Sequence, residues 1–126
     1  MPSEVKRTDR IAPRMLREIA DILRDDVKDP RVRDVIVTRV EVSGDLSLAR
    51  VFFRLLEGGA DPSKVDAATR GVESAAKTVR RAVAQRMTLQ RAPEIRFRYD
   101  AGQDARARVD ELLEEIRKDD AARPQE

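Results

Sequence analysis

The stretch VIVTRVEVSGDLSLARVFFRLL, residues 35–56, decides the fold. Its first part, Val35 to Val42, is almost entirely β-branched. In its last part, Leu46 to Leu56, residues of a wholly apolar set alternate with residues of a mixed set. Both parts are therefore predicted strands. Ser43-Gly44-Asp45 between them is short enough for an antiparallel hairpin. One alternating set of the second strand is wholly apolar and is assigned to the core: Ala49, Val51, Phe53 and Leu55. The other set faces outwards: Leu48, Arg50, Phe52 and Arg54.

The residues before the hairpin predict an amphipathic helix. Apolar residues follow one another at spacings of three and four along one face: Leu16, Ile19, Ala20, Leu23 and Val27. Pro13 fits the first turn of a helix, so we expect the helix to begin near residues 11–13. Asp29-Pro30 ends it, because proline disfavours helical geometry at the preceding residue. Residues 1–9 are polar and unpatterned, and are predicted to form a flexible N-terminal arm.

The residues after the hairpin predict further helices and a third strand. Asp61 and Pro62 are typical of an N-cap and a first helical residue. The apolar pattern that follows would span about 26 residues as one helix. A helix kink at Ser74, Ala75 and Ala76 is therefore plausible, although the periodicity does not require it. The third strand is Glu94 to Tyr99. A last helix is expected from about Asp104, with Val109, Leu112, Leu113 and Ile116 on its apolar face.

These elements indicate an α+β domain. Three strands with helices on one face form two layers. The order α-β-β-α-α-β is that of a type II KH domain, an RNA-binding fold, with an added C-terminal helix. We expect one KH-like RNA-binding domain over residues 10–118 and a disordered tail over 119–126.

Composition excludes several kinds of site. The chain has no Cys and no His, so disulfides, the usual zinc sites, thiol nucleophiles and imidazole chemistry are absent. The acidic pairs are adjacent in sequence, so their side chains diverge on a helix and do not form a catalytic pair. No apolar run approaches the roughly 20 residues that span a bilayer, and the first residues lack a signal core. We expect a cytoplasmic monomer with no membrane contact, no catalytic residues, no metal and no cofactor.

Positive charge is concentrated in one part of the chain. The net charge is only +2, but residues 77–98 carry seven basic residues and one acidic residue. On a helical projection Lys77 and Arg81 lie opposite the apolar stripe, whereas Arg80 and Arg86 flank it. RNA affinity comes largely from contacts of Lys and Arg side chains with phosphates. The predicted RNA-binding residues are Lys77, Arg80, Arg81, Arg86, Arg91 and Arg70.

The outward sheet face offers a second set of cations. It would carry Arg39, Arg50, Arg54, Arg96 and Arg98, with Phe52 among them. RNA-binding domains that read bases stack several of them on aromatic side chains, and one phenylalanine is too few for that mode. The sequence therefore favours solvated charges on this face, and recognition of folded RNA by shape and backbone. The acidic segment 99–126 is a candidate shield for the basic surface.

Four segments together resemble the bacterial ribosome-binding factor A family. Residues 40–51, VEVSGDLSLARV, resemble its hallmark hairpin. Asp29-Pro30-Arg31 precedes the first strand, Val79-Arg80 lies in the second helical region, and residues 87–100, MTLQRAPEIRFRYD, match the run into the last strand. The resemblance covers about residues 10–117.

The resemblance implies a function. Members of this family are type II KH domains that bind the free 30S ribosomal subunit late in assembly, assist maturation of the 16S rRNA 5′ end, and matter most in the cold. In them a kinked helix junction, usually Ala-any-Gly, replaces the clamp loop of ordinary KH domains. Here the matching triplet is Ala75-Ala76-Lys77, so a lysine stands where the family has glycine and the bend is less easily reached.

Three other functions remain open from the sequence. The first is a KH-like RNA-binding regulator without a ribosomal role. The second is an adaptor whose basic strip meets an acidic protein. The third, and weakest, is a nuclease or another enzyme, because an active centre would have few suitable side chains.

Overall fold

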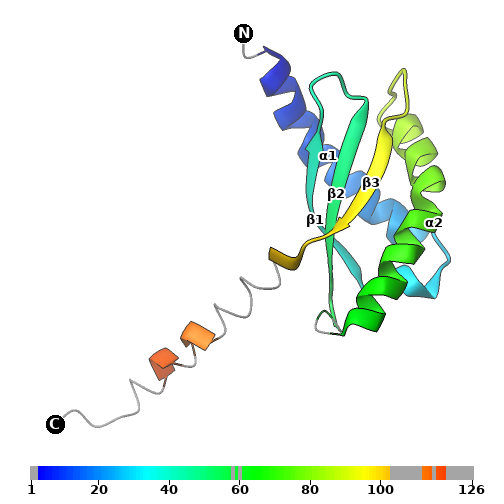
Figure 1. Cartoon of the computed structure of the whole chain (residues 1–126). Helices are drawn as coiled ribbons and strands as arrows, with labels where there is room; N and C mark the ends of the chain where they lie inside the picture. The colour runs from blue at the N-terminus through cyan, green and yellow to red at the C-terminus, as the bar shows by residue number, and fades with distance from the viewer. Residues whose placement is uncertain (1–2, 58, 60, 103–111, 115, 119–126) are drawn as a thin grey trace.

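The predicted hairpin forms the centre of the structure. The computed structural model describes residues 3–57, 59, 61–102, 112–114 and 116–118, with side chains described from Arg10 onwards. The elements, in chain order, are α1 (Ser3–Asp25), the short 3-10 helix η1 (Pro30–Val32), β1 (Val35–Val42), β2 (Leu48–Leu55), α2 (Pro62–Arg86) and β3 (Glu94–Tyr99). Both predicted strands of the hairpin, and the third strand, are confirmed (Figure 1).

The sheet has the order β1-β2-β3. β1 is antiparallel to β2, and β3 is parallel to β2, with Val51 opposite both Val40 and Phe97. A β-bulge at Thr38 interrupts the first pairing, because Val37 lies opposite Phe53 whereas Arg39 lies opposite Phe52. The bulge adds one residue, so Val37 and Val40 both reach the core although three positions separate them.

Both helices cover the same face of the sheet. The core set predicted for β2 is confirmed, since its four side chains are at most 5% exposed. α1 packs on β1, α2 packs on β3, and the two helices also touch each other. In Figure 1, α1 passes behind the strands, and the other face of the sheet is turned to the viewer. Phe53 lies at the centre of this core, edge-on to the rings of Phe97 and Tyr99.

The predicted start of the first helix is wrong. α1 begins at Ser3 and includes Pro13, so residues 3–9, expected to be an unpatterned arm, are helical. Proline removes only one backbone donor, and Pro13 lies on the exposed side of the helix, where the missing bond is tolerated. The apolar stripe is also rotated from the prediction. It buries Met15, Ile19, Ile22 and Leu23, and leaves Leu16, Ala20 and Val27 half-buried.

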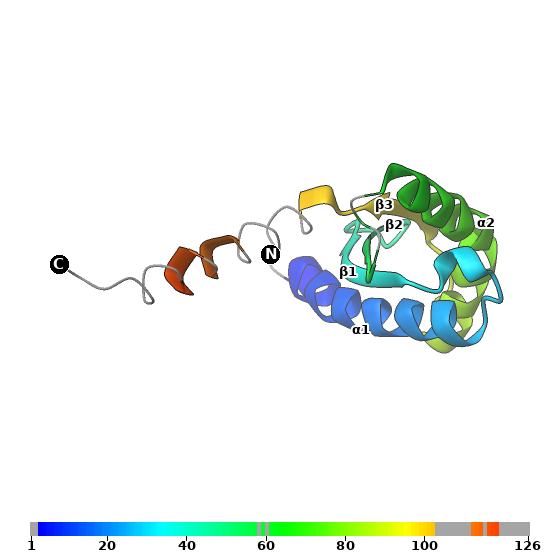
Figure 2. The same cartoon turned by 90° about the horizontal axis from the view of Figure 1, so that it is seen from below.

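The second long helix is continuous. Its predicted start is confirmed, because the Asp61 carboxylate accepts a hydrogen bond from the backbone N–H of Ser63 and Pro62 is in the first turn. α2 runs without interruption through residues 74–76, so the two middle helices expected from the sequence are one. Figure 2 shows that α2 changes direction part-way along its length. A kink at Ser74, Ala75 and Ala76 in particular stays a prediction.

Most of the predicted C-terminal helix lies outside the described residues. Residues 112–114 and 116–118 are helical, and Leu112, Leu113 and Ile116 are exposed. Residues 103–111 and the predicted tail, 119–126, are not among those described. The domain division at residues 9 and 118 therefore stays a prediction. Within the described part of the chain, no helix has the length and apolar character needed to cross a membrane.

Candidate RNA interface

The exposed side of α2 carries two cations without ion-pair partners. The helix buries Val72, Val79 and Val83 against the sheet, so residues on the opposite side point to solvent. Lys77 and Arg81 lie there, one helical turn apart, and both are exposed as predicted. Among the described residues, no carboxylate forms an ion pair with either of them. Their charges are therefore available to an external anion.

A hollow lies beside these two cations. It has a volume of about 430 Å³, and its lining contains no acidic residue. The lining residues are Lys77, Arg80, Arg81, Ala84, Gln85 and Ala92. Three positive charges therefore surround one concave surface between α2 and the loop that precedes β3.

Arg80 fixes that loop against the helix. Its guanidinium donates from Nε and Nη2 to the backbone oxygen of Ala92, at 3.2 and 3.1 Å. An arginine has five N–H donors, so the remaining ones are free to donate to a phosphate oxygen. Because the Ala92 carbonyl has no net charge, these hydrogen bonds leave the positive charge of Arg80 uncompensated. The residue can position the loop and contact RNA at the same time.

Arg86 is engaged within the protein. Its Nη2 lies 3.0 Å from a carboxylate oxygen of Asp26, and its Nη1 lies 3.6 Å from one of Glu18. Its backbone oxygen accepts a hydrogen bond from Arg14. These contacts join α2 to α1, so the structure gives Arg86 a structural role besides the predicted contact to RNA.

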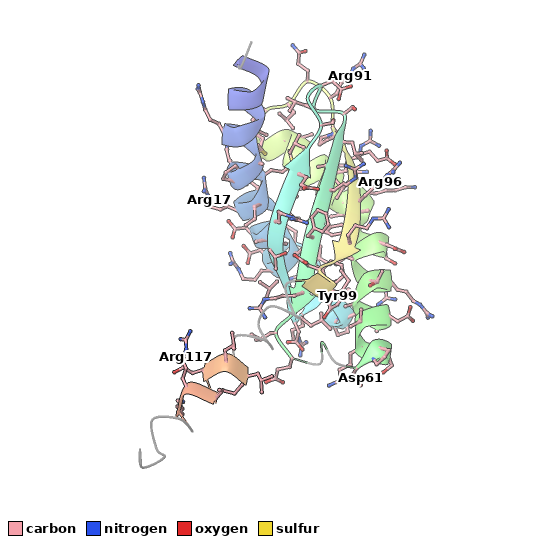
Figure 3. All side chains as sticks on the ribbon, turned by 60° about the vertical axis from the view of Figure 1, so that its left-hand side comes forward. Arg17, Asp61, Arg91, Arg96, Tyr99 and Arg117 are labelled. Carbon is pink, nitrogen blue, oxygen red and sulfur yellow. The ribbon has the colours of Figure 1, made fainter. Side chains whose placement is uncertain are left out.

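The two remaining predicted residues are not among those that line the hollow. Arg70 precedes Lys77 by two turns on the exposed side of α2 and forms an ion pair with Asp66 at 2.8 Å. Arg91 is exposed in the loop beside Ala92, and within the described structure it forms no ion pair (Figure 3). Of the six predicted residues, three therefore line the hollow, two lie elsewhere on the exposed surface and one is paired with Glu18 and Asp26.

The arrangement suits an extended polyanion. Guanidinium and ammonium groups bind phosphate by charge-assisted hydrogen bonds. Within the described residues, no three carboxylates gather closely enough to hold a metal ion. The surface offers positive charge and N–H donors, which is the chemistry of binding to a nucleic-acid backbone.

Comparison with known proteins identifies the family. The family model described as ribosome-binding factor A matches residues 7–113. The chain belongs to the ribosome-binding factor A family. A ribosome-binding factor A of Sorangium cellulosum is 42% identical over 117 residues, which are 93% of this chain and 94% of that protein. The resemblance drawn from the four sequence segments is thereby confirmed.

Solved structures of ribosome-binding factor A proteins share the fold. The crystal structure of a Thermus thermophilus ribosome-binding factor A matches with a TM-score of 0.63 at 22% identity, covering 73% of this chain and 94% of that one. A Thermus thermophilus homology model, fitted into a cryo-EM map of a 30S–RbfA complex, matches with a TM-score of 0.54 at 24% identity, covering 69% of this chain and 88% of that one. The α+β, KH-like fold class is confirmed.

Sequence reasoning missed the contact that positions α2. Gly71 is buried against η1, and a Cβ atom there would lie 2.9 Å from side-chain carbons of Arg31 and Val32. Asp29 was predicted only to end the first helix. In the structure it caps η1, because its carboxylate accepts a hydrogen bond from the backbone N–H of Arg31. The same carboxylate forms an ion pair with the Arg31 guanidinium at 2.7 Å. A glycine in the middle of a predicted helix was the available signal for such a close approach.

Proposed function

We propose that this protein is a non-catalytic assembly factor that binds the free 30S ribosomal subunit through 16S rRNA. Its membership of the ribosome-binding factor A family supports the ribosome as the target. The complex of a Thermus thermophilus relative with the 30S subunit supports the small subunit as the partner. The protein acts as a monomer in the cytoplasm, without a cofactor, on the late maturation of 16S rRNA, including its 5′ end, and in adaptation to cold.

One observation carries the choice of surface. Lys77 and Arg81 are exposed cations without ion pairs in the described structure, and they border a hollow that Arg80 also lines. Each phosphate contact releases condensed counterions, so binding through this surface depends on salt. The hollow is lined by aliphatic and polar groups with no aromatic ring, which favours recognition of the RNA backbone over the stacking of bases.

The side chains that the chain possesses support a non-catalytic role. It has neither His nor Cys, the residues that most often serve as general base or nucleophile at neutral pH. The candidate surface contains only cations, one amide and alanines, so it has no group to activate water. We propose that the protein acts by binding and by holding rRNA in a productive arrangement.

Co-sedimentation tests this proposal. The purified protein is expected to pellet with free 30S subunits and not with complete 70S ribosomes. Lys77→Glu combined with Arg81→Glu should weaken binding to free subunits by at least about tenfold. Arg10→Glu combined with Arg17→Glu, two exposed positions of α1, is the control with the same change in net charge. Equal binding of both double variants would contradict the assigned surface.

The role in maturation needs a test in cells. Removal of the gene should slow growth at low temperature and increase the share of 16S rRNA with an unprocessed 5′ end. The wild-type gene and the α1 control variant should restore both, and the Lys77/Arg81 variant should not. A KH-like regulator without a ribosomal role is the alternative: it would bind RNA and not co-sediment with 30S subunits.

A further inference from the structure

The sheet face that the helices leave uncovered carries a second group of cations. Figure 3 shows Arg96 projecting from β3 on this side. Five arginines extend from the three strands here: Arg39, Arg50, Arg54, Arg96 and Arg98. Two glutamates share the face, Glu41 on β1 and Glu94 at the start of β3. The face therefore has a clear excess of positive charge.

The strand register arranges these side chains in rows. Arg50 lies between two neighbours, Glu41 on β1 and Arg96 on β3, and Arg98 lies opposite Phe52. Adjacent strands are about 5 Å apart, so Arg50 and Arg96 are close like charges. Like charges in opposed positions destabilise a sheet. Glu41 lies opposite Arg50 but forms no ion pair with it in the described structure, so a polyanion lying across the row would offset the repulsion between the arginines.

A phenylalanine supports the neighbouring row. The guanidinium carbon of Arg39 lies 4.1 Å from the centroid of the Phe52 ring. This cation–π contact positions the arginine without a carboxylate, so its charge stays uncompensated. Arg98 lies on the other side of Phe52 by register. The row thus presents two arginines on either side of a half-buried aromatic ring.

Ion pairs neutralise little of this charge. Arg96 pairs with Glu94 at 3.4 Å, and both side chains are about half exposed, at 50% and 57%. Exposed pairs of this kind are weak and open readily in favour of a stronger anion. Within the described structure, Arg50 and Arg98 form no ion pair. The sequence favoured solvated charges on this face, but the register and the small number of ion pairs favour a ligand.

We propose that the open sheet face is a second RNA-binding surface, which holds a phosphate backbone independently of the α2 surface. The inference rests on the proposed function for its class of partner. Arginine donates paired hydrogen bonds to phosphate oxygens, and rows of arginines across strands match a charged backbone. The exposed side of α2 points away from the sheet, because the opposite side of that helix packs on it. The domain therefore lies between two RNA segments and joins them.

The test uses three double variants of the full chain. Arg50→Glu with Arg98→Glu alters the sheet face, Lys77→Glu with Arg81→Glu alters the α2 surface, and Arg10→Glu with Arg17→Glu is the control with the same net charge. Binding is measured to free 30S subunits and to protein-free 16S rRNA over a range of salt concentrations. The sheet variant should bind both about tenfold more weakly, with a log–log salt slope reduced by about 1.5. The α1 control should retain near wild-type binding.

Each other outcome is decisive. Wild-type binding by the sheet variant would overturn the inference, and the arginines would then only solvate the face. Loss of binding to subunits with normal binding to protein-free rRNA would also overturn it, because the sheet would then meet a ribosomal protein. If the wild-type protein bound neither probe, the proposed function itself would fail. If Arg50→Glu with Arg98→Glu unfolds the domain, Arg50→Gln with Arg98→Gln provides the same comparison without reversed charges.

Discussion

The guanidinium of Arg86 lies 3.0 Å from the carboxylate of Asp26 and so joins the last turn of α2 to the end of α1. Glu18 adds a second carboxylate at 3.6 Å, which makes a three-membered charge network between the helices. Only 35% of the Arg86 side chain is exposed, whereas Lys77 and Arg81 extend into solvent. Cations of one helix thus have different surroundings: Arg86 is paired within the protein, and Lys77 and Arg81 face solvent.

Arg86→Ala should lower the free energy of unfolding by about 1 kcal/mol, because both inter-helix ion pairs are lost. The carboxylates of Glu18 and Asp26 then remain near each other without the guanidinium between them. Urea denaturation followed by circular dichroism measures the change. Arg81→Ala, on the same helix, should change stability by less than about 0.5 kcal/mol, because no ion pair is removed. Equal losses in the two variants would show that the network contributes nothing specific.

Lys77→Gln should reduce the steepness of the salt dependence of rRNA binding by about 0.7 to 0.9 in a log–log plot, since one phosphate contact is lost. Arg86→Gln should leave this slope unchanged, because its charge is already compensated by Asp26 and Glu18. Filter binding to 16S rRNA between low and moderate salt provides both slopes. A reduced slope in Arg86→Gln would return that residue to the RNA-binding set.

Gly71→Ala should destabilise the protein by about 1 kcal/mol, although alanine favours a helix over glycine by about that amount. The added Cβ would lie 2.9 Å from carbons of both Arg31 and Val32, so η1 has to move away from α2. Thermal unfolding of Gly71→Ala, compared with Ser74→Ala at an exposed position of the same helix, measures the effect. A stabilised Gly71→Ala protein would show that η1 shifts at no cost.

The hairpin turn should be sensitive to acid through Asp45. Hydrogen bonds from the hydroxyl groups of Ser47 and Ser43 and from the backbone N–H of Ser47 lower the pKa of the Asp45 carboxyl to about 2, from an ordinary value of 3.8. Because the folded-state pKa is the lower one, the unfolded chain takes up the proton first. The stabilisation is therefore complete above about pH 5 and is lost as the pH falls from about 4 towards 2.

Two measurements check this expectation. Carbon-detected NMR titration of the folded protein should give a pKa of about 2 for the Asp45 carboxyl. The difference in unfolding free energy between wild type and Asp45→Asn should be constant near neutral pH and shrink below about pH 4. The other carboxylates are common to both proteins, so their titration cancels in the difference. An Asp45 pKa near 4 would contradict the hydrogen-bonded turn.

Local patterns were enough to predict the hairpin and part of the candidate site. Alternation identified the buried set that contains Phe53, because side chains of a strand point to opposite faces in turn. Asp61 and Pro62 marked the start of α2, since an N-cap and the residue after it act within a single turn. The helical projection placed Lys77 and Arg81 in solvent, because the periodicity of a helix fixes which residues lie opposite its apolar stripe. Their contact with RNA stays a prediction.

Tertiary structure decided what depends on partners distant in the chain. The bulge at Thr38, whose hydroxyl donates to the backbone oxygen of Phe52 and to Asp100, follows from pairing across the sheet and leaves no mark in the local pattern. Asp26 lies 60 positions from Arg86, so no spacing rule joins them. The sequence by itself determined the three strands and the start of α2, because propensity and periodicity are properties of neighbouring residues, but it did not determine the start of α1. That Arg86 is held within the protein was decided only when packing brought the carboxylates of Glu18 and Asp26 to it.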